Sequence, residues 1–225
     1  MAHTLGPRQA RKLETRRSLL DAALRLLEWH SLNSLGLREV AREAGIAPAA
    51  FYRHFDGLDA LGVAVVEESF GSLRAMVGAL RGQGAASDEV IRQTVDVIAA
   101  HVREHRAHFR FLARERYGGV PGVRAAIAAE LDAFVQDLSG DLAVQPESAG
   151  WSAEDVRVLA ELYVNHVVLT AAALLEADLE HPEIERRIIG TASAQLRLIA
   201  LGRRHWLDDE KGSGEKGGGE KGGGE

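Results

Sequence analysis

Residues 36–55 read GLREVAREAGIAPAAFYRHF and predict two short helices joined by a tight turn. The apolar residues of the first helix recur at intervals of three and four, as on one buried helical face, and they are Leu37, Val40, Ala41 and Ala44. Gly45 then ends this helix, and Pro48 suits the first turn of the next one. This spacing is typical of a helix-turn-helix, whose second helix enters the major groove of DNA.

On both sides of this stretch the apolar residues keep helical rather than alternating spacing, so we expect an all-α protein of about nine helices. We predict helices over residues 11–30, 37–44, 48–55, 59–77, 88–105, 107–117, 121–142, 152–177 and 182–206. Pro121 and Pro182 each stand near the start of a predicted helix, and Ser152 with Asp155 indicates a capping box. The last two helices are long and close in sequence, so they should pair as an antiparallel hairpin.

The composition excludes several kinds of chemistry. The 225 residues include no cysteine, which rules out disulfides, thiolate zinc sites, iron–sulfur clusters and a cysteine nucleophile. The formal net charge is -6, but residues 1–55 hold nine Lys and Arg against five Asp and Glu, and the remaining residues hold 18 against 28. A basic head on an acidic body is the charge distribution of a small nucleic-acid-binding module attached to a second unit.

We divide the chain into three parts. Residues 11–58 form the predicted helix-turn-helix domain, and residues 59–206 form a helical ligand-binding and dimerisation domain. Residues 207–225 have an EKGGG period and almost no apolar side chains, which predicts a disordered tail. The N-terminus has no apolar segment, and the uncharged apolar stretches are far shorter than the ~20 residues of a membrane span, so we expect a cytoplasmic protein.

Three segments make the chain similar to the TetR family of bacterial transcriptional repressors, from residue 11 to about residue 206. They are TRRSLLDAA (15–23), LREVAREAGIA (37–47) and FYRHF (51–55). With the later HFRFLARER (108–116), they resemble the branch that represses unsaturated-fatty-acid synthesis and desaturase genes and responds to long-chain acyl-CoA. The resemblance implies a homodimer, joined through the last two helices, that binds an inverted repeat in double-stranded DNA and buries an acyl chain in its C-terminal domain.

The resemblance also implies which side chains contact DNA. Arg16, Tyr52 and His54 are expected to bind phosphates or sugars. Arg53 is expected to read base edges in the major groove. The alternative is that Tyr52 and His54 only pack against the first helix.

Departures from the family pattern limit direct readout. Gly36 and Ala47 stand where the family usually caps helices with Ser or Thr, and an Ala cap costs about 1 kcal/mol. Ala49 and Ala50 cannot hydrogen-bond a base, although their methyl groups can pack on a thymine methyl group. We therefore expect direct readout to depend on three longer side chains, those of Arg38, Tyr52 and Arg53.

A basic set of side chains in the acidic body is predicted to meet the effector. Arg106, Arg110 and Arg114 lie at spacings that share one helix surface, and guanidinium groups suit the phosphates of CoA. Two alternatives stay open. These arginines hold the body against the DNA-binding domain, or they pair with acids such as Glu104 and Glu115.

Further side chains on the later helices are candidates for the effector cavity. The apolar candidates, for which ordinary core packing is the alternative, are Phe109, Phe111, Leu131 and Phe134. Asn165 and His166 interrupt a helix that is otherwise apolar on nearly every side. We expect them to line the cavity, to hydrogen-bond across a dimer interface, or to be satisfied within the core.

Rival chemistries have less support. Residues 101–105, HVREH, match an inverted zincin pattern, but neighbouring arginines repel a cation and no convincing third ligand is near, so we predict no metal site and no cofactor. Without a nucleophile elbow or a phosphate loop, we expect no enzymatic activity. The alternative function is a repressor of an efflux or other pathway whose effector is aromatic or cationic. The operator, the preferred acyl chain, the sign of the effector's action and the role of the tail stay open.

Overall fold

The computed structural model describes residues 6–80, 88–177 and 180–206. In this part of the chain there are nine α-helices, two short 3-10 turns and no strand, which confirms the all-α prediction. The helices are α1 (Pro7–Leu27), α2 (Leu37–Glu43), α3 (Pro48–Phe51), α4 (Leu58–Leu80), α5 (Asp88–Glu104), α6 (Arg106–Glu115), α7 (Pro121–Ala143), α8 (Ala153–Glu176) and α9 (Pro182–Arg203). The 3-10 turns are η1 (Leu32–Ser34) and η2 (Pro146–Ser148). The predicted tail lies outside the described residues.

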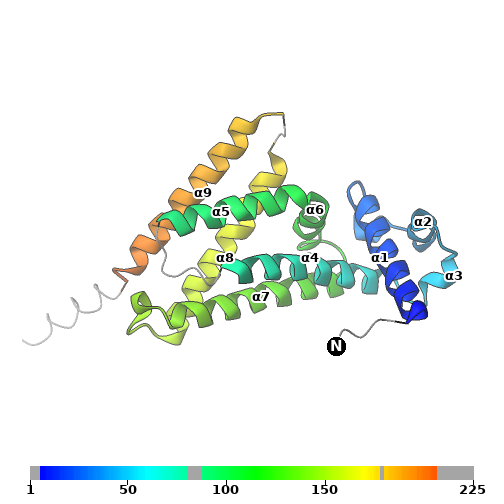
Figure 1. Cartoon of the computed structure of the whole chain (residues 1–225), viewed down its shortest axis with the longest axis horizontal. Helices are drawn as coiled ribbons and strands as arrows, with labels where there is room; N and C mark the ends of the chain where they lie inside the picture. The colour runs from blue at the N-terminus through cyan, green and yellow to red at the C-terminus, as the bar shows by residue number, and fades with distance from the viewer. Residues whose placement is uncertain (1–5, 81–87, 178–179, 207–225) are drawn as a thin grey trace, which may run out of the picture.

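The helices form an elongated molecule with α1, α2 and α3 at one end and α9 toward the other (Figure 1). α4 and α7 lie side by side along the long axis, and α8 crosses them and packs against α5, α7 and α9. Short α6 lies between the body and α1. The helix-turn-helix is therefore linked to the rest of the chain through α1, α4 and α6.

Two helix boundaries differ most from the sequence prediction, by four residues each. α1 begins at Pro7 rather than at residue 11, because proline at the first helical position lacks only an N–H that has no partner in any helix. α3 ends at Phe51, before the predicted end at residue 55. The N–H groups of Arg53 and His54 bond to the carbonyls three residues back, the tighter pattern of a helix end.

The predicted helix starts at Ser152, Pro121 and Pro182 are confirmed. Ser152 accepts a hydrogen bond from the Asp155 N–H at 3.1 Å, and the Asp155 carboxylate accepts one from the Ser152 N–H at 3.3 Å. Pro121 and Pro182 occupy the first turns of α7 and α9. Gly36 and Ala47 are the caps of α2 and α3, and neither supplies a side-chain hydrogen bond.

One apolar core extends from the helix-turn-helix into the body. Its fully buried members come from six helices, and they include Leu19, Val40, Phe51, Leu61, Phe111 and Ile127. At the crossing of α4 with η1 and α7, a methyl group on Gly62 would press on Leu32 and come within 2.8 Å of Val123. Packing is therefore continuous across residue 58, the predicted end of the helix-turn-helix domain. A shift of α6 or α7 must then change the packing around the DNA-binding helices.

Candidate functional site

The turn between α2 and α3 is fixed by a glycine in the left-handed region. Gly45 has a φ of 70°, its N–H donates to the Arg42 carbonyl at 3.1 Å, and the Ile46 N–H donates to the Ala41 carbonyl at 2.9 Å. This pair of bonds is the Schellman pattern that ends many helices. It turns α3 so that Phe51 is buried, and Tyr52 and Arg53, which follow it, are exposed, whereas Phe55 returns to the core.

Most of the predicted DNA-contacting side chains lie on one exposed surface. Tyr52 is 62% exposed, and Arg53, Ala49 and Arg38 are also exposed. Ala50 is half-buried. Tyr52 and Arg53, which are exposed just after the end of α3, are therefore available to contact a DNA duplex.

Arg16 and His54 lie at the edge of this surface. The Arg16 guanidinium stacks over the Phe55 ring at 4.4 Å from its centroid, which fixes the end of α3 to α1. His54 is half-buried, and burial lowers its pKa, with further lowering by the charges of Lys12, Arg16 and Arg53. The electrostatic potential here is therefore positive, as a phosphate-binding surface requires.

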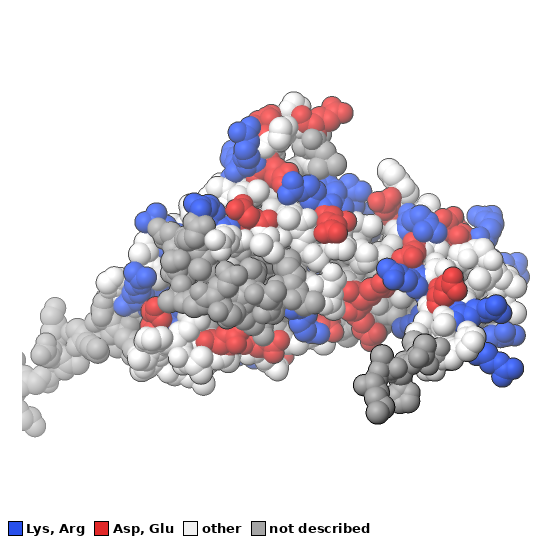
Figure 2. Space-filling model, in the orientation of Figure 1, with Lys and Arg blue, Asp and Glu red and all other residues white. Residues whose placement is uncertain are grey.

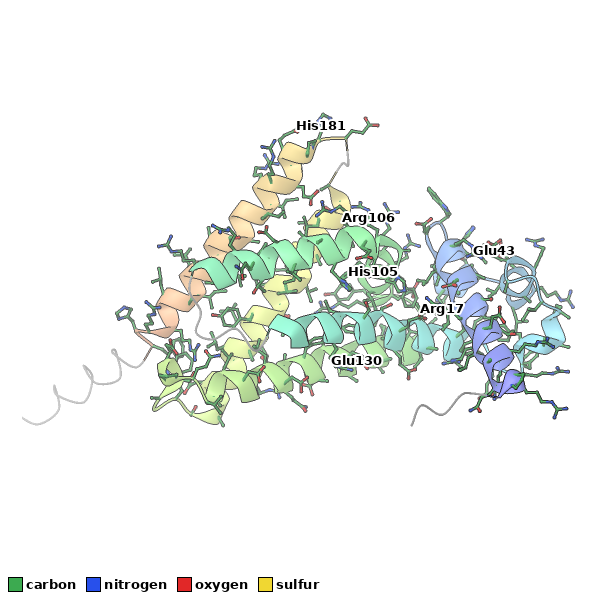
Figure 3. All side chains as sticks on the ribbon, viewed as in Figure 1. Arg17, Glu43, His105, Arg106, Glu130 and His181 are labelled. Atoms are coloured by element: carbon green, nitrogen blue, oxygen red, sulfur yellow. The ribbon has the colours of Figure 1, made fainter. Side chains whose placement is uncertain are left out.

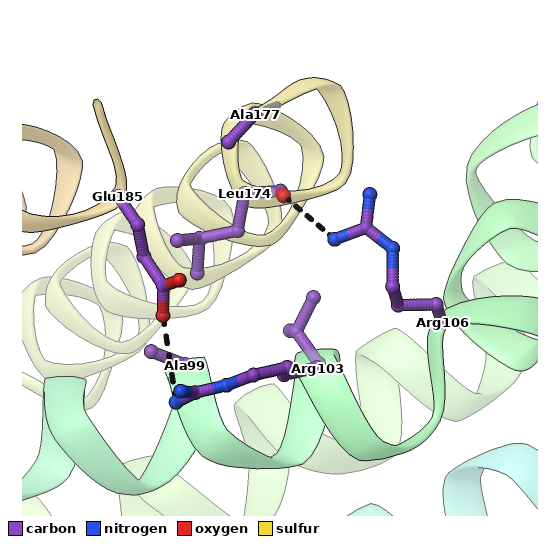
Figure 4. Close-up of a pocket in the computed structure, with 7 residues that line it drawn as sticks. Ala99, Arg103, Arg106, Leu174, Ala177 and Glu185 are labelled. Carbon is purple, nitrogen blue, oxygen red and sulfur yellow. Dashed lines mark hydrogen bonds and ion pairs between the residues drawn. The ribbon is translucent and has the colours of Figure 1, made fainter. Parts of the chain in front are cut away.

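Of the predicted basic set, Arg106 lies at the corner between α5 and α6 (Figure 3). Arg106 donates to the carbonyls of Leu174 and Leu175, at 3.3 and 2.7 Å, and so caps the end of α8. Arg103 pairs with Glu185 of α9 at 3.4 Å. Figure 4 shows both arginines beside a small cleft with a volume of about 10 Å³ and apolar walls from Ala99, Val102, Leu174 and Ala177.

The other end of α6 holds the body against α1. Arg114 donates to the carbonyls of Leu27 and His30, at 2.9 and 2.6 Å, and thereby caps the C-terminus of α1. Arg110 lies 3.9 Å from Glu28. Of the two alternatives for the basic set, the structure shows contact with the DNA-binding domain for Arg114 and Arg110.

One member of this contact does not follow from sequence reasoning. The sequence suggests Glu115 only as a partner for arginine, but it is 2% exposed and accepts a hydrogen bond from the Leu32 N–H at 3.0 Å. Nothing in the local sequence indicates a bond between residues 83 positions apart. Gly118, three residues later, is consistent with the buried position of Glu115, because a side chain at residue 118 would collide with the Glu115 carboxylate.

The four apolar cavity candidates do not surround one space. Phe111, Leu131 and Phe134 belong to the main core, where Phe134 contacts the Phe70 ring at a centroid distance of 5.9 Å. Phe109 instead packs with a separate cluster formed by α5, α8 and α9. Phe109 therefore lies beside the cleft region and the other three lie nearer to α1 and α4.

Asn165 and His166 face different surroundings. His166 is half-buried and hydrogen-bonds to the backbone of Ala192 on α9, and burial lowers its pKa. Asn165 is exposed, on the α8 face that also carries Val158, Leu162 and Leu169. Asn165 therefore does not line a cavity within this protomer.

The exposed face of α8 is apolar. Val158, Leu162 and Leu169 are between 49% and 70% exposed, and Leu198 and Leu201 of α9 are similarly open. By length and composition alone α8 could span a membrane, with a mean hydropathy of 1.7 over its most apolar window. Large apolar side chains in a row at helical spacing are equally typical of an interface with another protein surface.

The two histidines of the zincin-like pattern contact each other with tilted rings, and His108 lies edge-on to the second of them. The His101 and His105 rings are 4.4 Å apart and the His105 and His108 rings 5.7 Å apart. Burial is the main cause that lowers the pKa of His101 and of His108. Across the described residues, no three His, Asp or Glu side chains are grouped so as to hold a metal ion.

Two family models match the chain. The model of bacterial regulatory proteins of the tetR family matches residues 19–65, and the tetracyclin repressor-like C-terminal domain matches residues 87–199. The first covers the helix-turn-helix described above. The second covers about half of the chain and extends from α5 to α9.

Solved structures share the fold over most of their length. A TetR-family transcriptional regulator from Streptomyces coelicolor is 25% identical, with a TM-score of 0.62 over 83% of this chain and 96% of that one. The transcriptional regulator FadR from Bacillus subtilis, in complex with stearoyl-CoA, is 15% identical, with a TM-score of 0.63 over 83% and 98%. AibR, in complex with isovaleryl coenzyme A and operator DNA, is 18% identical, with a TM-score of 0.59 over 79% and 97%.

The fold and both family models agree from the helix-turn-helix to the last helix. The chain therefore belongs to the TetR family of bacterial regulatory proteins, which are DNA-binding transcriptional regulators.

Proposed function

We propose that this regulator is a cytoplasmic, dimeric repressor whose operator affinity is controlled by long-chain acyl-CoA and whose targets are genes of fatty acid desaturation or synthesis. The observation that carries the proposal is α6, which joins an arginine-bordered apolar cleft at one end to the DNA-binding helices at the other. No catalytic step is required of the protein.

The DNA-binding part of the proposal rests on the surface after α3. Arg53 would read base edges in the major groove, with Tyr52, His54 and Arg16 on phosphates or sugars. The exposure of Arg53 and Tyr52 supports these roles. Arg38 and the methyl groups of Ala49 and Ala50 would complete the contact.

The effector part rests on the cleft between α5, α6, α8 and α9. Four of its lining residues are apolar, and the others are Arg103, Arg106 and Glu185, the acid that pairs with Arg103. Apolar walls and two guanidinium groups at the rim suit an acyl chain that ends in a phosphate-bearing head. Arg110, whose ion pair with Glu28 is long at 3.9 Å, is a second candidate for the CoA phosphates. FadR and AibR, which share this fold, bind stearoyl-CoA and isovaleryl coenzyme A, and this supports an effector of the same class.

The cleft volume of about 10 Å³ holds roughly one water molecule. An acyl chain that enters here must separate α8 from α5 and break the Arg106 bonds to Leu174 and Leu175. The effector therefore selects a different conformation of the body. Because Arg114 and Glu115 lie on the same short helix as Arg106, that conformation repositions α1 and couples effector binding to DNA binding.

The dimer part rests on the exposed apolar faces of α8 and α9. Burial of Val158, Leu162, Leu169, Leu198 and Leu201 against a second protomer would remove these side chains from water. Asn165 would lie within that interface. Two recognition surfaces then present themselves to half-sites about 34–36 Å apart on one face of DNA.

The test combines ligand identification with DNA binding. Mass spectrometry of small molecules that copurify with the protein should detect a CoA thioester, and affinity for the upstream DNA of its own gene should change at least tenfold with a saturated or an unsaturated acyl-CoA. A copurified aromatic or cationic compound, with no response to any acyl-CoA, would instead support regulation of an efflux or other pathway.

A further inference from the structure

A basic groove runs between the first turns of α1 and the segment after α3. Its volume is about 530 Å³, and it is lined by Pro7, Arg8, Arg11, Lys12, Thr15, Arg53 and His54. Figure 2 shows Lys and Arg gathered at this end of the molecule. Arg53, the base-reading candidate, therefore also forms part of the groove wall.

The groove exists because α1 begins one turn earlier than the sequence pattern predicts. Pro7 starts the helix, so Arg8, Arg11 and Lys12 fall at helical spacings of three and four residues and share one face. All three side chains are exposed, and the first turn has no acidic residue. These residues lie before residue 19, where the match to the family's DNA-binding domain begins.

The positive charge of the groove is not neutralised by the protein. Elsewhere on α1, Arg25 pairs with Glu43 at 2.7 Å, but Arg8, Arg11 and Lys12 have no ion pair among the described residues. The charged groups that face His54 are Lys12 and Arg16 from α1 and Arg53 from its own segment, and all three are cationic. A concave surface with several cations and no carboxylate has the charge complementary to a polyanion.

We propose that this groove binds the sugar-phosphate backbone of the operator beside the bases read by Arg53, with Arg8, Arg11 and Lys12 on successive phosphates. This inference rests on the proposed DNA-binding function. Because Arg53 belongs both to the recognition surface and to the groove wall, a duplex that reaches Arg53 must bring its own backbone to the groove. The contacts add affinity without sequence information, since phosphates are the same in every sequence.

The experiment uses the full-length dimer and the triple variant Arg8→Ala, Arg11→Ala, Lys12→Ala. The matched control, Arg92→Ala, Arg157→Ala, Arg186→Ala, removes the same charge from exposed positions on α5, α8 and α9, outside the groove and outside the row of exposed apolar residues proposed for the dimer. Operator affinity is measured by fluorescence anisotropy between 50 and 250 mM KCl, and circular dichroism checks that both variants are folded. The slope of log affinity against log salt is negative, and each lost phosphate contact should reduce its magnitude by about 0.9.

Three contacts per protomer are six per dimer, so we expect the magnitude of the slope to decrease by about 5 in the groove variant. In the control it should stay near the wild-type value. The ratio of specific to random-sequence affinity should be preserved, and hydroxyl-radical footprinting should show loss of backbone protection beside each half-site. Equal slopes for the two variants, with unchanged footprints, would overturn the inference and leave the proposed function standing. If the wild-type protein binds no DNA, both fail together.

Discussion

At the scale of single residues, the contact between body and DNA-binding domain depends on a few charged side chains of α6. Arg114 satisfies carbonyls that every helix C-terminus leaves without intrahelical partners, and Glu115 satisfies the Leu32 N–H. Each bond links groups more than 80 residues apart in sequence. The hydrogen-bond partners of α6 therefore define the path by which the two functions communicate.

We predict that Arg114→Ala lowers the free energy of unfolding by about 1 kcal/mol, because the partly solvated bonds to the end of α1 are lost. The same change should reduce the effect of acyl-CoA on operator affinity. Urea denaturation and anisotropy titrations with and without effector measure the two quantities. Arg186→Ala, which removes the same charge from an exposed position on α9 outside the cleft, is the control, and equal effects of both changes would contradict the assignment.

Half-buried histidines should make the fold sensitive to acid. Burial lowers the pKa of His108 below its ordinary 6.5, so the unfolded chain binds a proton more readily than the folded one. Neutral His108 therefore contributes to stability above pH 6.5, and this contribution is lost as the pH falls through the lower pKa of the folded state. We expect the free energy of unfolding to fall from pH 7 to pH 5, and to fall less steeply in His108→Gln than in wild type, with exposed His30→Gln as the control.

At the scale of helices, the boundaries follow from local rules wherever local groups determine them. The Ser152 capping box, the Pro121 and Pro182 helix starts and the Gly45 turn are predictable, because each depends on residues within a few positions. The start of α1 at Pro7 obeys the same rule, but the apolar pattern that predicts the rest of α1 does not extend that far.

The candidate site is only partly predictable from the sequence. The exposure of Arg53 follows from the helical pattern around it, because the apolar residues of the motif fix which side is buried. The capping roles of Arg106 and Arg114 and the burial of Glu115 come from tertiary packing between distant segments. No periodicity within α6 distinguishes these residues from ordinary surface charges.

The crossing of α4 with η1 and α7 provides a test of close packing. Gly62→Ala should lower the free energy of unfolding by about 1–3 kcal/mol, because the added methyl group must displace buried Leu32 and Val123. In the same helix Gly71 has no atom within 4 Å of an added methyl group, so Gly71→Ala should raise stability by up to about 1 kcal/mol. Calorimetry of both variants gives the comparison, and equal changes would show that the crossing is not tight.

At the scale of the whole molecule, function requires two copies. The apolar faces of α8 and α9 lie away from the helix-turn-helix, so a dimer formed there leaves both recognition surfaces free (Figure 1). Leu169→Glu should convert the dimer to a monomer, as measured by analytical ultracentrifugation, and should weaken operator binding at least tenfold. Val144→Glu, at an even more exposed position beyond the end of α7, should leave the dimer intact.

Selection of bound sequences from a library of random DNA duplexes tests the central claim most directly, because the operator sequence need not be known in advance. For the wild-type protein we predict enrichment of an inverted repeat with half-sites centred about 10 base pairs, or a multiple of that distance, apart. For Arg53→Ala we predict weaker binding by about 1–3 kcal/mol and relaxed preference at one position in each half-site. Enrichment of no repeat, or the same repeat with undiminished affinity after Arg53→Ala, would contradict the account.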